Sequence, residues 1–299
     1  MKPHHGTAVV IISLVLSGFS LFAQQTPDTL YIPKVSVPKY APGQGPVVMV
    51  DEAHHNFHTT TNRFKPFANL LRHDGYKLIA RKEQISAAVL GGVGILVISN
   101  ALHENNIEEW TLPNPPAFTE EEIDIIKEWV SSGGSLLLIA DHMPFPGAAE
   151  KLASVFGFTF YNGFALTDKI VYAPELFCKA NGRLKDHPIT APLDSILTFT
   201  GQGFEIPDNA QPLLALDDAF YILLPETAWK FSDETPRIDG DGKFQGATLA
   251  YGKGKVAVFG EAAAFSAQIS QGMFHMGFNH PHAKHNAQFV LNVIHWLDE

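Results

Sequence analysis

The clearest pattern along the chain is a series of short apolar runs, each of which stops abruptly at a polar residue. These runs span Val47–Val50, Gly94–Ser99, Ser135–Ala140 and Lys255–Gly260. Short apolar runs bounded by Pro, Gly or polar residues are typical of buried strands. The pattern therefore predicts four core strands. The residues that follow them are predicted to emerge at the carboxyl ends of these strands.

Amphipathic segments alternate with these runs and predict helices. Phe64, Phe67, Leu70 and Leu71 share one face of a helix that ends before Asp74-Gly75. Thr119 and Glu122 have the spacing of a capping box. Further helices are predicted at Glu83–Leu90, Pro146–Phe156 and Lys284–Leu297, and shorter strands at Tyr76–Ala80 and Phe158–Tyr161. Strands that alternate with helices across short joints predict a doubly wound, mostly parallel α/β sheet.

The middle of the chain, residues 162–241, is less regular and rich in proline. Its β-prone segments, Ile196–Thr200, Leu213–Leu216 and Tyr221–Leu224, favour an antiparallel β extension of the sheet. Gln245–Tyr251 and the following Gly252-Lys253-Gly254 predict a hairpin. We expect a single α/β domain over residues 46–299, with 162–241 as an insertion.

The first residues have the features of a secretory signal. Lys2 precedes an apolar segment from Ala8 to Phe22, and the small Ala23 stands where cleavage would occur. The alternative is an uncleaved amino-terminal anchor. We expect a signal peptide over residues 1–23 and a linker over 24–45; the alternative for Thr29–Val37 is an extended lead-in strand. The mature protein is expected to be exported, periplasmic or secreted, with no stable membrane anchor.

Composition narrows the classes of partner and chemistry. The 299 residues carry a formal net charge of −10, without a cluster of Lys and Arg, which argues against nucleic acid as partner. Cys178 is the only cysteine, so no internal disulfide forms, and it lacks the neighbours of a catalytic thiol. No phosphate-binding glycine motif is present, so we expect no nucleotide cofactor. His-Glu-x-x-His, a paired-cysteine metal motif and a Gly-x-Ser-x-Gly elbow are also absent.

Polar residues follow each core strand, and in a parallel sheet such ends meet at one edge. The residues there are Asp51, Glu52, His54, His55, Asn100, Asp141, His142 and Glu261. The stretch Gly272–His285 is predicted to fold over this edge and to add His275, Asn279, His280, His282 and His285. Carboxylates and imidazoles in one cleft bind a divalent metal or form acid–base pairs with separated pKa values.

The residue types predict a role for each member of this set. The catalytic candidates are Asp51, Glu52, Asp141, His142 and Glu261. The metal candidates, for a divalent ion such as zinc, are His54, His55, His142, His275 and His280. The substrate-binding candidates are Asn100, Asn279, His282 and His285.

A structural role is the alternative for several of these residues. Asp51 and Asp141 have the position of helix caps, and Glu261 precedes an Ala-rich helix start. His54 and His55 are adjacent and would point opposite ways, so at most one of them is expected to face the cleft. His58 is expected to lie at the surface or on a helix face.

Three segments resemble the class I glutamine amidotransferase-like superfamily, and more narrowly its exported branch related to ThuA-like and gliding-motility-type domains. They are the opening strand with its His-rich exit, EEIDIIKEWVSSGGSLLLIADH, and GKGKVAVFGEAAAFSAQ, in which Glu261 replaces the usual Asp. The resemblance covers Pro46–Tyr161 and Gln245–Glu299 and implies a flavodoxin-like fold. It does not imply amidotransferase activity, because no cysteine occupies the strand-to-helix turns at Asn100 and Asp141.

Two functions remain open from the sequence. One is an exported hydrolase with a carboxylate/His site, with or without metal assistance, that acts on a small molecule or on a glycan or peptide fragment. The other is a non-catalytic domain that uses the same edge to hold a ligand or partner.

Overall fold

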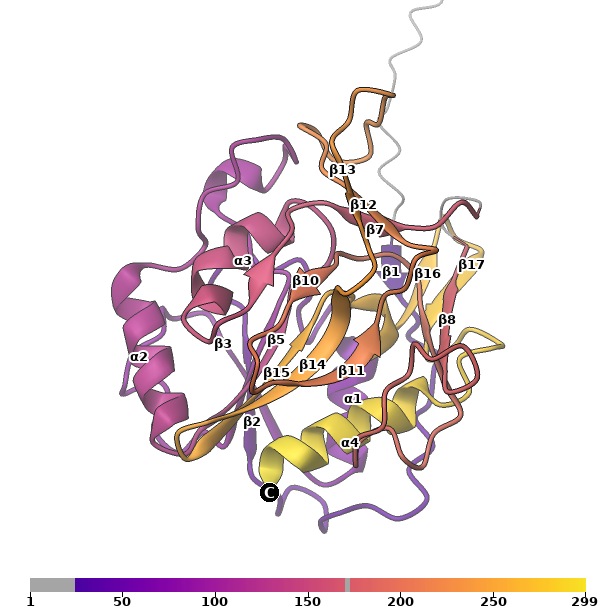
Figure 1. Cartoon of the computed structure of the whole chain (residues 1–299). Helices are drawn as coiled ribbons and strands as arrows, with labels where there is room; N and C mark the ends of the chain where they lie inside the picture. The colour runs from indigo at the N-terminus through magenta and orange to yellow at the C-terminus, as the bar shows by residue number, and fades with distance from the viewer. Residues whose placement is uncertain (1–24, 170–172) are drawn as a thin grey trace, which may run out of the picture.

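A nine-stranded sheet forms the centre of the protein (Figure 1). The computed structural model describes residues 25–169 and 173–299. Eight strands follow the order β3-β2-β4-β5-β15-β14-β10-β6, and β11 also pairs with β14. Their bounds are β2 Val47–Asp51, β3 Lys77–Arg81, β4 Ile95–Ser99, β5 Ser135–Ile139, β6 Thr159–Phe160, β10 Phe204–Glu205, β11 Gln211–Ala215, β14 Phe244–Tyr251 and β15 Gly254–Phe259.

The pairing of the strands changes from parallel to antiparallel at the hairpin of β14 and β15. Strands β3, β2, β4, β5 and β15 are parallel neighbours, and their carboxyl ends share one edge. Strands β14, β11, β10 and β6 continue the sheet with antiparallel pairings. The mixed α/β class and the large, mostly parallel sheet with an antiparallel extension are therefore confirmed. Of the three segments predicted to form this extension, only Leu213–Leu216 does so, as part of β11, whereas Ile196–Thr200 and Tyr221–Leu224 pair in separate antiparallel sheets.

Helices cover both faces of the sheet because the side chains of each central strand alternate between two cores. Val48 and Val50 pack in one core with α1 (Lys65–His73) and α4 (Asn286–Asp298). Met49 packs in the other with α2 (Glu120–Ser131) and α3 (Phe145–Ser154). Figure 1 shows these two pairs on opposite sides of the sheet. In the described residues no helix is both long and apolar enough to cross a membrane.

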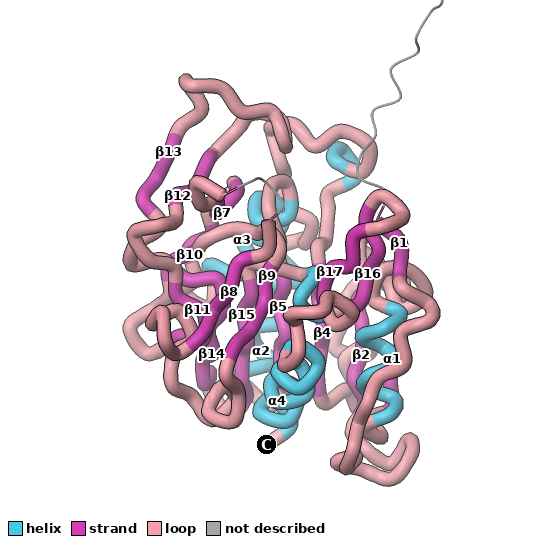
Figure 2. The backbone as a smooth tube through the Cα atoms, turned by 90° about the vertical axis from the view of Figure 1, so that its right-hand side faces the viewer, coloured by secondary structure: helices cyan, strands magenta, loops and turns pink. Residues whose placement is uncertain are grey.

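Smaller sheets lie at the end of the molecule where the parallel strands finish. One contains β7 (Phe164–Leu166), β12 (Tyr221–Leu223) and β13 (Arg237–Asp239). Another contains β1 (Gln25–Pro27), β16 (Ala267–Ser270) and β17 (Phe274–Gly277). Figure 2 shows both at the end opposite the C-terminus of α4. The remaining elements are the pair β8 (Glu175–Cys178) and β9 (Ser195–Thr198) and the short helices η1 (Glu104–Asn106) and η2 (Ala263–Phe265).

Two local predictions are wrong, and a third is confirmed only as a short strand. Glu83–Leu90 forms turns, and its buried apolar residues Ile85 and Leu90 lie five positions apart, which does not make a helical stripe. Thr29–Val37 forms no strand. Tyr31 and Val35 pack against the core, whereas Leu30 and Ile32 are 87% and 75% exposed. The strand predicted at Phe158–Tyr161 has only two residues, and it pairs antiparallel with β10. The signal peptide predicted over residues 1–23 lies outside the described residues.

Candidate functional site: a buried carboxyl pair at the edge of the parallel strands

Three strand ends are in direct contact at the carboxyl edge of the sheet. Asn100 follows β4, and its Oδ1 accepts a hydrogen bond from the backbone N–H of Asp141 after β5, at 2.9 Å. Asp141 Oδ2 in turn accepts from the N–H of Ala262, next to Glu261 at the end of β15, at 3.3 Å. Asn100 has a φ of 50°, a left-handed conformation that Asn tolerates better than most residues. These bonds bring the exits of β4, β5 and β15 together.

Asp141 and Glu261 form a buried carboxyl pair. Their side chains are 7% and 2% exposed. Asp141 Oδ1 accepts from the N–H of His142, and the two Glu261 oxygens accept from the N–H groups of Ala263 and Ala264 at 2.9 and 2.8 Å. Burial raises the pKa of Asp141. Burial and the neighbouring Asp141 charge raise the pKa of Glu261 well above its ordinary value. The pair therefore holds a proton at a pH where ordinary carboxyl groups are ionised.

His142 stands beside this pair as a neutral imidazole with a fixed orientation. Its Nδ1 lies 2.8 Å from the backbone oxygen of Met143, so Nδ1 carries the proton and Nε2 keeps its lone pair. Burial lowers the pKa of His142. No hydrogen bond to Nε2 occurs within the part of the chain that the structure describes.

Aromatic rings surround His142. The ring of Phe164 stacks on it with a centroid distance of 4.7 Å, and Trp229 meets it edge-on at 4.6 Å. Trp110 and Phe145 complete the surround, each with its ring centroid 5.8 Å from the imidazole. These ring contacts fix the plane of the imidazole.

His58 belongs to the same buried region, contrary to the prediction of a surface residue. It is 2% exposed, and its Nδ1 lies 3.3 Å from Ser99 Oγ. Burial, with the nearby charge of Arg63, holds the pKa of His58 well below its ordinary value. His58 is thus a neutral imidazole near His142.

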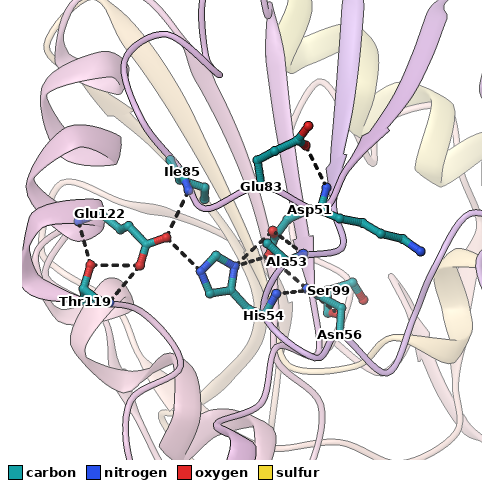
Figure 3. A network of polar contacts seen from close by, with 10 residues as sticks. Asp51, Ala53, His54, Asn56, Glu83, Ile85, Ser99, Thr119 and Glu122 are labelled. Carbon is teal, nitrogen blue, oxygen red and sulfur yellow. Dashed lines mark hydrogen bonds and ion pairs between the residues drawn. The ribbon is translucent and has the colours of Figure 1, made fainter.

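A second polar network joins the exit of β2 to the start of α2 (Figure 3). His54 Nδ1 lies 2.9 Å from Asp51 Oδ2, and its Nε2 lies 3.0 Å from Glu122 Oε1. Both partners are acceptors, so both ring nitrogens must donate and His54 is an imidazolium. Burial alone would lower the pKa of His54, but its hydrogen bond with Asp51 and the charges of Asp51 and Glu122 outweigh burial and raise it.

Glu122 serves two elements at once. Its Oε2 accepts from the N–H and hydroxyl of Thr119, which confirms the predicted capping box. Its Oε1 accepts from His54 and from the N–H of Ile85. Burial favours the neutral acid, but the Thr119 bonds and the His54 charge prevail and lower the pKa of Glu122.

The other candidates near β2 lie away from the carboxyl pair. Glu52 Oε1 accepts from the N–H and hydroxyl of Thr60 at 2.7 and 2.8 Å, which fixes the loop after β2. His55 is exposed with a φ of 46°, whereas the adjacent His54 is buried. Asp51 is 1% exposed and also accepts from the side-chain amide of Asn56.

The candidates in Gly272–His285 contact the edge only indirectly. Asn279 donates to the oxygen of Gln268 and to Asp28 Oδ2. The ring of His280 lies 5.5 Å from that of Phe199, whose backbone N–H bonds to Glu261. The exposed residues His275 and His282 lie near His280, and burial together with their charges lowers the pKa of His280. His285 Nε2 is 4.0 Å from Asp194. Within residues 25–169 and 173–299, no hydrogen bond joins this stretch's candidate side chains to Asp141, His142 or Glu261.

Several buried side-chain nitrogen and oxygen atoms near the carboxyl edge make no hydrogen bond with the described residues. Within the described residues, the buried atoms without a hydrogen-bond partner include Arg63 Nε, Asn100 Nδ2, Gln202 Oε1, Gln245 Oε1 and Gln268 Oε1. A cavity of about 20 Å³ borders Phe199, Thr200 and Gln245, with room for about one water molecule.

Among the described residues, no group of three or more His, Cys, Asp or Glu side chains is arranged to hold a metal ion.

Comparison with known proteins finds solved structures with a similar fold but no match by sequence. No family model and no curated protein matches the chain. The structure is similar to the mmIFT52 N-terminal domain, with a TM-score of 0.59 and 16% identity over 84% of this chain and 97% of that one. This likeness shows the fold alone.

Two further likenesses are more distant. A ThuA-like protein from Bacteroides uniformis matches 89% of this chain and 94% of its own, at a TM-score of 0.43 and 13% identity. A β-galactosidase from Bacillus circulans matches 85% of this chain and 30% of its own, at a TM-score of 0.46 and 9% identity. Both are too remote to establish a relationship.

Proposed function

We propose that the chain is a hydrolase-like protein whose acid–base centre is formed by Asp141, Glu261 and His142. The observation that carries this proposal is the buried carboxyl pair with raised pKa values beside an oriented, neutral imidazole. Buried titratable groups with perturbed pKa values at the carboxyl edge of a parallel sheet are typical candidates for acid–base chemistry. The scaffold that we propose is a flavodoxin-like, doubly wound sheet of the ThuA-like, amidotransferase-like kind.

The three groups would divide the proton transfers of hydrolysis. The carboxyl group that retains its proton donates it to the leaving group of the substrate. His142 Nε2, whose lone pair is available, accepts a proton from the attacking water. The substrate class that we propose is a small molecule or a glycan or peptide fragment. Divalent metal binding, zinc first, remains a separate proposal that metal analysis of the purified protein tests, and the proton transfers described here do not require it.

A non-catalytic binding domain is the second candidate, and the hydrogen bonds of the carboxyl pair favour it. Asp141 accepts from the N–H groups of His142 and Ala262, and Glu261 accepts from those of Ala263 and Ala264. Carboxylates engaged in this way act as caps of the turns that leave β5 and β15. In that case the same edge would only bind a ligand or partner protein.

Hydrolysis assays decide between the two candidates. The purified protein is tested on chromogenic glycosides, esters and peptides, and Asp141→Asn, Glu261→Gln and His142→Gln are compared on any substrate that is turned over. Loss of an acid or base should lower kcat about 10²- to 10⁴-fold. His55→Gln, which changes an exposed imidazole, is the matched control. Circular dichroism establishes that each variant is folded.

Two outcomes contradict the enzyme proposal. One is the absence of turnover on every class by a folded protein that nevertheless binds a ligand in calorimetry. The other is turnover that the three variants leave unchanged. Export is proposed from the first residues of the sequence, and sequencing the N-terminus of the mature protein tests cleavage after Ala23.

A further inference from the structure

An open groove lies on the surface near the aromatic rings that surround His142. Its volume is about 570 Å³, within the range of ligand sites. Its lining includes Thr111, Leu112, Pro113, Asn114, Glu150 and Glu226. Three separate parts of the chain supply these residues: the loop after η1, α3, and the segment that follows β12.

The segments that line the groove also carry the rings around His142. Trp110 directly precedes Thr111, and Phe145 lies in α3, five residues before Glu150. Trp229 lies three residues after Glu226. A ligand seated in the groove would therefore lie against the same segments that enclose the imidazole.

Hydrogen bonds hold these segments in one arrangement. The N–H of Leu112 donates to the oxygen of Glu226 at 2.9 Å, and that of Ala228 donates to the oxygen of Trp110 at 2.8 Å. The amide of Asn162, which also lines the groove, donates to Asn114 Oδ1 at 2.7 Å and accepts from the N–H of Gly147 in α3. The groove is thus preformed, which lowers the entropic cost of binding.

The charges and the apolar wall specify the chemistry of the occupant. Glu150 and Glu226 are exposed carboxylates, and the lining formed by the described residues contains no Lys or Arg. Leu112, 49% exposed, and Pro113 form an apolar surface beside them. Lys and Arg side chains have an aliphatic stem and a cationic end, which match such a surface. The formal net charge of −10 also attracts cationic ligands.

We propose that this groove binds basic peptide segments, with Glu150 and Glu226 receiving Lys or Arg side chains and Leu112 and Pro113 contacting their aliphatic stems. The groove binds the peptide whether or not cleavage follows. The further statement that the groove binds the substrate rests on the proposed hydrolase function. If the chain is that hydrolase, basic peptides are its substrate class.

Fluorescence anisotropy with the full chain tests the binding. The probe is a fluorescein-labelled hexapeptide of alternating Lys and Leu, and the comparison peptide carries norleucine in place of Lys. Each of Glu150→Gln and Glu226→Gln should weaken binding about two- to fivefold at low salt, and the double variant more, because exposed ion pairs contribute modestly. Asp194→Asn, a carboxylate whose side chain is 95% exposed, is the control for net charge and should bind as the wild type does.

Three results would overturn the groove proposal: binding that the double variant leaves unchanged, equal binding of the norleucine peptide, or no binding of the Lys peptide at millimolar concentration. Cleavage is measured separately by mass spectrometry. Glu-dependent binding without cleavage supports the groove and contradicts the hydrolase proposal for this substrate. Turnover that depends on His142, together with unchanged peptide binding in the double variant, supports the hydrolase proposal and contradicts the groove proposal.

Discussion

Replacing His54 by Gln removes the cation between two buried carboxylates. The side chains of Asp51, His54 and Glu122 are 1%, 6% and 5% exposed, so solvent screens their interactions little. Breaking a buried ion pair by removing one partner costs about 3–5 kcal/mol. Because the Gln amide donates to only one of the two carboxylates, we expect a loss of about 3 kcal/mol in the free energy of unfolding at pH 6.

Urea denaturation at pH 6 and pH 9 measures this loss and its pH dependence. The pKa of His54 in the folded protein is raised above 6.5, so its charged form contributes fully below pH 6.5. The contribution disappears as the pH rises through the folded pKa. The difference in stability between wild type and His54→Gln should therefore be larger at pH 6 than at pH 9.

The exposed neighbour provides the matched control. His55→Gln should change stability by less than about 0.5 kcal/mol, as surface substitutions usually do. A loss below about 1 kcal/mol for His54→Gln at pH 6, or a difference that grows toward pH 9, would refute the interpretation of His54 as a buried imidazolium that bridges two carboxylates.

Three further predictions concern the carboxyl edge. Glu261 has a raised pKa in the folded protein, so its ionisation lowers the stability of the fold as the pH rises above 4.5. In thermal denaturation at pH 8, Glu261→Gln should therefore be at least as stable as the wild type. Glu261→Ala should lose about 2 kcal/mol, because the hydrogen bonds from the N–H groups of Ala263 and Ala264 are lost. The folded pKa of His58 lies below 6.5, so stability should fall as the pH drops through 6.5, and His58→Asn should flatten this part of the urea-midpoint profile. Asn100→Ala should cost about 2–3 kcal/mol from the left-handed backbone and the lost Asp141 bond, and Asn100→Gly less, as measured by chemical denaturation.

Local pattern was sufficient to predict the central strands and the helices that cover them. Apolar runs such as Gly94–Ser99 and Ser135–Ala140 coincide closely with β4 and β5, because a strand buried on both faces needs uninterrupted apolar residues. The capping box at Thr119 was visible for the same reason, since its bonds span only three residues. The meeting of Asn100, Asp141 and Glu261 follows from parallel pairing, which places strand ends at one edge.

Contacts between distant segments could not be predicted in this way. Glu122 Oε2 fulfils the local capping pattern, but its Oε1 bonds to His54, 68 residues earlier in the chain. His58 lies in a polar stretch, and its burial depends partly on Gln268, 210 residues later. The aromatic rings around His142 likewise come from segments whose sequences contain no shared motif.

The two ends of the described chain differ in how far an attached label would lie from the carboxyl edge. Gln25 pairs with Ser270 in β16, and the same strand carries Gln268, which contacts His58 near the carboxyl edge. The last helix finishes near the opposite edge, where the oxygen of Leu297 accepts from Ser135 at the start of β5. A tag or a surface linkage joined to Glu299 would therefore leave the carboxyl edge open to solution, whereas one close to Gln25 would crowd it. Immobilised binding assays on this protein should be built from the C-terminus.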